Sequence, residues 1–184
     1  MKLTKPEGQD YIQPQTGLTQ AVITAIYDMG SRPNKFKEGK LKREVMIVFT
    51  LPKQLHENEM LTISVWTTAS IHEKSNLYGL ITDLGITIDT EFDLNDLLGI
   101  NCMANLTERT KDNGDVRINV SSVAPIIEGM EQFELPTFKF SLDEYVQAEF
   151  DALSEGLQNV IKETPEFKAL AGPLADIDTT KKAS

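Results

Sequence analysis

A basic segment over residues 31–43 has the residue types best suited to binding chemistry. It combines several cations and one aromatic ring with a single carboxylate, Glu38. The cations are Arg32, Lys35, Lys37, Lys40, Lys42 and Arg43, and the ring is Phe36. Cations follow phosphates, and an aromatic ring stacks on a base for about 1–3 kcal/mol. The composition therefore favours single-stranded nucleic acid, and a solvated loop whose lysines aid solubility is the alternative.

Two further aromatic residues are candidate stacking platforms. Trp66 is the only tryptophan, and it alternates with apolar neighbours, which places it on the polar face of a strand with Thr62 and Ser64. It could equally cover one end of a core. Tyr27 is a second candidate, at the end of an apolar stretch.

A second group of cations surrounds an Asn113-Gly114 turn. Arg109, Lys111 and Arg117 could close the other side of a groove, although two neighbouring acids, Asp112 and Asp115, weaken that interpretation.

The sequence favours neither an enzyme nor a cofactor site. There is no glycine-rich phosphate loop of the G-x-x-x-x-G-K-[ST] type. Cys102 is the only cysteine, so we expect no intrachain disulfide and no cysteine-based zinc site, and we predict a buried strand position for it. Acids between residues 83 and 96 lack calcium-loop spacing and are interpreted as solvated.

The elements that must position these residues follow from periodicity. Strands are predicted over residues 18–28, 42–51, 60–67, 100–109 and 116–123, the last two joined by the Asn113-Gly114 hairpin. Ser75 is a helix cap before Leu77, Leu80, Ile81 and Leu84. The predicted order is therefore three strands, a helix and two strands.

The remainder of the chain forms flanking regions. Residues 1–16 read as an extended lead-in before a domain at 17–125. Residues 126–164 form a C-terminal extension, in which Ser141 and Glu144 resemble a capping box that opens an acidic amphipathic helix from Leu142 to about Thr164. Residues 165–184 are predicted to be a disordered tail.

Charge is distributed unevenly along a chain whose net charge is −10. Basic residues exceed acidic ones over 1–50, and acidic residues exceed basic ones over 51–125 and 126–184. The negative total argues against coating of duplex DNA by bulk positive charge. The N-terminus lacks the apolar stretch of a signal peptide, and no run spans a membrane, so we expect a cytoplasmic protein.

The element order resembles the oligonucleotide/oligosaccharide-binding (OB) fold, a five-stranded Greek-key barrel with a helix between strands 3 and 4. Residues 17–125 also resemble phage-type single-stranded DNA-binding proteins, through the strand at 21–26 and the F-D-L-x-x-L-L-G-x-x-C-x-A-x-L segment at 92–106. The resemblance implies binding of single-stranded DNA on the barrel face. The final residues, Lys181-Lys182-Ala183-Ser184, depart from the acidic ending of such proteins, which puts recruitment of partners by the tail in doubt.

The leading hypothesis is a non-enzymatic, single-stranded DNA-binding protein of phage replication or recombination, in the bacterial host cytoplasm. Replication or recombination proteins are candidate partners of the acidic C-terminal region, and homo-oligomerisation stays open. The main alternative is a protein-interaction adaptor on an OB-like scaffold that docks through the helix at 141–164. A weaker third reading is a DNA mimic that uses the negative C-terminal half.

Overall fold

The computed structural model describes residues 12–34, 38–170 and 172. The protein is mainly β, with one six-stranded sheet and short helices, which confirms the predicted class. The strands are β1 (Gly17–Pro33), β2 (Leu41–His56), β3 (Glu59–Thr68), β4 (Asn101–Thr110), β5 (Val116–Pro125) and β6 (Phe138–Phe140). The helices are α1 (Asn76–Asp83), the short 3-10 helix η1 (Leu94–Leu97), α2 (Gln147–Asp151) and α3 (Glu155–Lys162).

The sheet follows the order β3-β2-β1-β4-β5, with antiparallel pairing throughout this path. β6 adds in parallel to β1 and was not foreseen as part of the sheet. The two outer strands, β3 and β5, approach to within 8 Å between Cα atoms, and α1 contacts both of them. The helix predicted after Ser75 is thus confirmed, with the Ser75 side chain accepting from the Tyr78 amide.

β1 is the longest strand and belongs to both halves of the sheet. Its first part, Gly17 to Val22, pairs with β4, and its second part pairs with β2. Register shifts follow Ile23 and Asp28, and bulges of this kind bend a strand and increase its twist. Gly30 lies in the second shift with φ +68, where an added Cβ would come within 2.6 Å of the Thr164 side chain. Only glycine fits that position.

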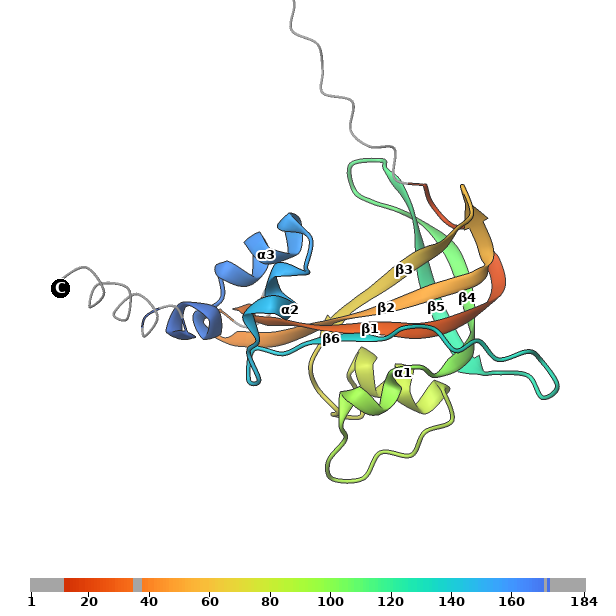
Figure 1. Cartoon of the computed structure of the whole chain (residues 1–184). Coiled ribbons are helices and arrows are strands. Elements are labelled where there is room, and N and C mark those ends of the chain that lie inside the picture. The colour runs from red at the N-terminus through yellow and green to blue at the C-terminus, as the bar shows by residue number, and fades with distance from the viewer. Residues whose placement is uncertain (1–11, 35–37, 171, 173–184) are drawn as a thin grey trace, which may run out of the picture.

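Two hydrophobic cores lie on opposite faces of the sheet. Figure 1 shows the helices that accompany them, with α1 below the strands and α3 above. The first core contains alternate residues of β1 and β2, such as Ile23, Ile47 and Phe49, and is covered by α1. The second lies on the other face, where Met29 and Met46 pack against the chain after residue 137. Phe140, Leu142, Phe150, Leu153 and Ile161 supply its buried C-terminal side chains. We call residues 138–170 the C-terminal lobe.

The expectation of one continuous helix from Leu142 is wrong. The Ser141 hydroxyl does accept from the Glu144 amide at 3.4 Å, but helix starts only at Gln147 and again after Ser154, which caps α3. The break lets Phe150 pack against Phe167, with ring centroids 4.9 Å apart. Residues 165–170 are helical as well, whereas 171 and 173–184 of the predicted tail lie outside the described residues.

Side-chain amides hold the extended segments against the sheet. Asn101 accepts from the amide of Phe133 at 2.8 Å and donates to its carbonyl at 2.9 Å, as a neighbouring strand would. Gln13 accepts from the Ile118 amide at 2.8 Å and donates to the Val116 carbonyl at 3.1 Å. The described end of the lead-in is therefore fixed to β5. None of the described helices is both long and apolar enough to span a bilayer.

Candidate nucleic-acid interface

Trp66 lies on the face of the sheet that carries the second core, which we call the outer face. The alternation in β3 predicted that it would project away from the first core. Trp66 is the cross-strand partner of Met46, and the residue is 39% exposed. The indole Nε1 donates a hydrogen bond to a carboxylate oxygen of Glu44, 2.9 Å away. The ring is therefore fixed in orientation while a large part of it remains accessible.

Glu44 holds a small charged cluster around this ring. The Lys42 ammonium lies 2.7 Å from one carboxylate oxygen, and the Arg32 guanidinium lies 3.7 Å from the other. The same guanidinium lies 5.5 Å from the centroid of Trp66, in cation-π range. Arg32 and Lys42 face each other across β1 and β2, which explains why one carboxylate serves both. We call Arg32, Lys42, Glu44 and Trp66 the tryptophan cluster.

Glu44 remains ionised because of its neighbours. Burial by itself would raise the pKa of this carboxyl, but hydrogen bonds from Lys42 and Trp66 and the charges of Lys42 and Arg32 outweigh it, so the pKa is lowered. The cluster brings two cations and one anion together beside an accessible indole. Sequence reasoning missed Glu44, because its contacts depend on cross-strand register.

Arg43 lies on the opposite face of β2 from this cluster. Its guanidinium bonds both carboxylate oxygens of Asp28 and lies 2.9 Å from Asp143 of the C-terminal lobe. Asp28 is buried and also accepts from the backbone amides of Gly30 and Leu142 at 3.0 and 3.1 Å. Hydrogen bonding to Asp28 raises the pKa of Arg43 above its ordinary value. The structure therefore uses Arg43 to attach the C-terminal lobe.

The structure describes only part of the rest of the basic segment. Lys40 is exposed beside the turn that leads into β2. Lys35, Phe36 and Lys37 lie outside the described residues, so their predicted part in binding stays a prediction. Of the six predicted cations, the structure brings two, Arg32 and Lys42, next to Trp66.

Tyr27 is less accessible than the sequence suggested. Its ring packs against Phe138, with centroids 5.8 Å apart, and burial raises its pKa. Next to it, a groove of about 430 Å³ runs along the outer face of the sheet. Its floor includes Thr24 and Thr50, whose hydroxyls are 2.8 Å apart. Its other lining residues are Ala25, Val48, Met60, Thr62, Leu135, Pro136 and Phe138. This uncharged groove was not foreseen, because one wall comes from the segment before β6.

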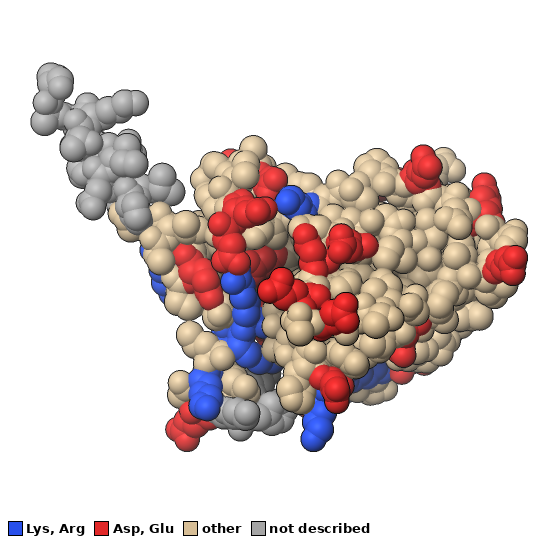
Figure 2. All heavy atoms as spheres, turned by 90° about the horizontal axis from the view of Figure 1, so that it is seen from below, with Lys and Arg blue, Asp and Glu red and all other residues tan. Residues whose placement is uncertain are grey.

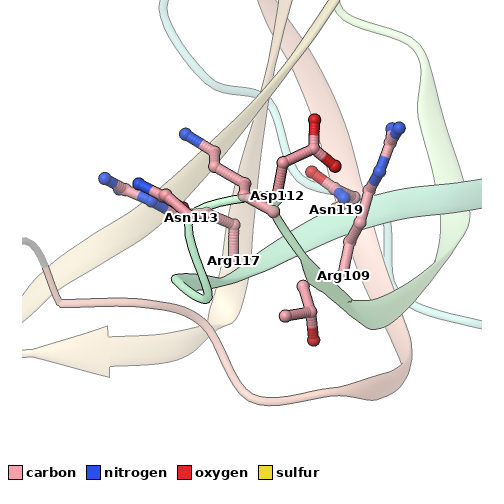
Figure 3. Close-up of a pocket in the computed structure, with 7 residues that line it drawn as sticks. Arg109, Asp112, Asn113, Arg117 and Asn119 are labelled. Atoms are coloured by element: carbon pink, nitrogen blue, oxygen red, sulfur yellow. The ribbon is translucent and has the colours of Figure 1, made fainter.

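Arg109, Lys111 and Arg117 gather at the β4–β5 hairpin. They line a pocket of about 470 Å³ together with Asn113 and Asn119 (Figure 3). This pocket shares no lining residue with the groove or with the tryptophan cluster, so the predicted cations form two separate groups.

Acidic side chains predominate on the face seen from below, with basic ones interspersed toward one side (Figure 2).

Cys102, predicted to be a buried strand residue, is fully buried in β4, and desolvation raises its pKa to about 12. Within residues 12–34 and 38–170, no group of His, Cys, Asp and Glu is arranged to hold a metal ion. No protein-family model and no curated protein sequence matches this chain.

Proposed function

We propose that this protein binds single-stranded DNA on the outer face of β1, β2 and β3, with Trp66 as a stacking platform. The observation that carries the proposal is an indole that is accessible and yet fixed by Glu44 and flanked by Arg32. A ring that is already ordered loses little conformational freedom when a base stacks on it. An adjacent cation can meet the phosphate of the same nucleotide.

The strand order supports the proposal. The path β3-β2-β1-β4-β5, with α1 between β3 and β4 in sequence, is the order expected of an OB barrel. Such a barrel closes where its two outer strands meet, and here β3 and β5 come close beside α1. We therefore propose an OB barrel, whose strands 2 and 3 form the usual binding face. Trp66 lies on that face.

The groove beside Tyr27 extends the proposed surface. Its threonine hydroxyls and apolar walls carry no charge, which suits unpaired bases more than phosphates. Phosphates would then lie along the cationic side, near Arg32, Lys40 and Lys42. We propose that this activity serves phage replication or recombination, without catalysis or a cofactor.

The direct test compares Trp66→Ala with Trp66→Phe in binding to a fluorescent oligo-dT, followed by anisotropy. Losing a stacked base costs about 1–3 kcal/mol, which is roughly 5- to 150-fold in Kd. The phenylalanine variant retains a ring but not the bond to Glu44, so we expect it to bind better than the alanine variant. Equal affinity of both variants and the unmodified protein would exclude Trp66 as a platform.

A protein-interaction adaptor is the second candidate function, favoured by exposed apolar side chains. Leu18, Leu41 and Leu55 are more than half exposed. However, the apolar residues of α2 and α3 pack in the second core, so the lobe offers that face to the sheet and not to a partner. Co-purification of a specific protein, with no shift of oligo-dT at low salt, would favour the adaptor.

A further inference from the structure

A groove between α1 and the two outer strands takes no part in the proposed DNA-binding surface. Its volume is about 410 Å³, and it shares no lining residue with the tryptophan cluster or with the groove beside Tyr27. The helix supplies Gly79 and Asp83 to its lining, β3 supplies Val65, and β5 supplies residues 120–123. We call it the α1 groove.

The floor of the α1 groove is apolar and lies where no hydrogen bonds close the sheet. Val65, Leu80 and Val123 are buried or half-buried there. No backbone hydrogen bond joins β3 to β5 in the part of the chain that the structure describes, although the two strands come within 8 Å between Cα atoms. An extended segment can therefore hydrogen-bond to an edge of β3 or β5 that has no partner strand.

Gly79 leaves the middle of α1 open to the groove. Glycine weakens a helix interior relative to alanine, because it loses more backbone freedom on folding. Neither conformation nor crowding requires a glycine here, since its φ lies outside the left-handed region and an added Cβ would meet no atom of the described fold within 4 Å beyond its own helical turns. What the glycine does permit is the close approach of another backbone to the helix.

The charge of this part of the surface is negative. Asp83 is exposed at the α1 groove, and its carboxylate forms no ion pair with any described residue. Lys74 is the single cation of residues 73–96, whereas six exposed acids lie in the same span: Glu73, Asp83, Asp89, Glu91, Asp93 and Asp96. Figure 2, seen from the side of α1, shows acids in the majority. An occupant of complementary charge is therefore basic.

We infer that the α1 groove binds an extended, basic segment of a partner protein. The backbone of the segment passes over Gly79, one of its apolar side chains contacts Val65 and Leu80, and a lysine or arginine meets Asp83. The inference goes beyond the proposed function, because none of these residues belongs to the proposed DNA-binding face.

The test selects binders to the unmodified protein from a displayed library of random dodecapeptides. The selected peptides are synthesised with a fluorophore, and anisotropy gives their Kd for the unmodified protein and for matched pairs of variants. Gly79→Gln places a side chain in the groove and favours the helix, whereas Gly156→Gln makes the same change in α3, at a glycine that also has open space around an added Cβ. Asp83→Asn and Asp89→Asn remove the same charge inside and outside the groove lining. Circular dichroism checks that each variant is folded.

We expect the selected peptides to be basic and to bind Gly156→Gln with unchanged affinity. Gly79→Gln should weaken binding roughly 5- to 150-fold, because an extra side chain overpacks the contact. Asp83→Asn should weaken it roughly two- to fivefold, the range of a partly exposed ion pair, and Asp89→Asn should weaken it less.

Three results would overturn the inference: no enriched sequence, enriched sequences without basic residues, or equal affinity for Gly79→Gln and Gly156→Gln. Sedimentation velocity tests a second copy of the chain as the occupant. Self-association that Gly79→Gln abolishes would assign the α1 groove to that copy and would also overturn the inference. Binding of oligo-dT reports separately on the proposed function.

Discussion

Replacing Glu44 by glutamine tests the tryptophan cluster, because it removes one charge and little else. Glu44 pairs with Lys42 at 2.7 Å and with Arg32 at 3.7 Å, so both cations are partly neutralised in the free protein. Glutamine has nearly the same shape, and its carbonyl oxygen can still accept from the Trp66 indole. We therefore predict that Glu44→Gln binds single-stranded DNA more tightly.

The expected gain follows from charge. Releasing one cation for a phosphate steepens the log–log salt slope by about 0.7, which is roughly a fourfold tighter Kd at 0.15 M salt. The cost to folding should be small, about 1 kcal/mol, because hydrogen bonds from Lys42 and Trp66 can persist with a neutral acceptor. That cost lowers Tm by roughly 2–4 °C for a chain of this length.

The assay is oligo-dT anisotropy across a salt series, with Glu134→Gln as the control, an exposed acid that makes the same change in net charge. A gain in Glu44→Gln well above that in Glu134→Gln supports local release of Arg32 and Lys42. Weaker binding by Glu44→Gln would refute this reasoning, since it would mean that the carboxylate organises the site more than it neutralises it.

The lowered pKa of Glu44 also predicts how the stability of the protein changes in acid. Because the folded pKa of Glu44 lies below the ordinary value of 4.5, its stabilising contribution is complete above that value and is lost as pH falls through the folded pKa. The Glu44→Gln variant should therefore lose less stability than the unmodified protein as pH falls below 4.5. Denaturant unfolding at a series of pH values measures it, and identical pH dependence of both proteins would contradict it.

Three further predictions concern the scaffold. Asp28→Asn should lower the free energy of unfolding by about 2–4 kcal/mol, because it weakens a buried acceptor of four hydrogen bonds. Asp143→Asn changes an exposed carboxylate and should cost less than about 1 kcal/mol. Denaturant unfolding measures both. Gly30→Ala should cost at least about 2 kcal/mol through clash and strain. Adding Thr164→Ala to that variant should recover only part of the cost, because the Cβ of residue 164 stays 2.7 Å from the added Cβ; full recovery would contradict both the clash and the strain at φ +68. Cys102 should react with a thiol reagent only as fast as the protein unfolds, and rapid labelling of the folded protein would contradict its burial.

Local patterns predicted most of the sheet and the first helix. Alternation in β2 and β3 separated Ile47 and Ile63 from Trp66 correctly, because period-two patterns directly reflect which face is buried. The Asn113-Gly114 signal located the hairpin, since a tight turn demands residues that tolerate positive φ. These features depend on neighbours in sequence.

Features that depend on distant residues were not predictable. β6 has only three residues and is held by pairing with Ala25 to Tyr27, more than a hundred residues earlier. The lobe helix breaks at Ser154, which caps α3, and the break lets Phe150 meet Phe167 in the second core, a tertiary contact that the local helical pattern does not reveal. Likewise, Lys42 and Arg43 are adjacent in sequence but lie on opposite faces of β2, where Lys42 pairs with Glu44 and Arg43 pairs with Asp28. Composition alone could not distinguish them, so both were predicted to bind nucleic acid.

The most direct test of the account is the fluorescence of Trp66, the only tryptophan, during titration with a short single-stranded oligonucleotide at two salt concentrations. Stacking of a base on the indole predicts saturable quenching, with an apparent Kd that rises steeply at the higher salt. Unchanged fluorescence at saturating oligonucleotide, at low salt, would contradict the assignment of the outer sheet face as the DNA-binding surface.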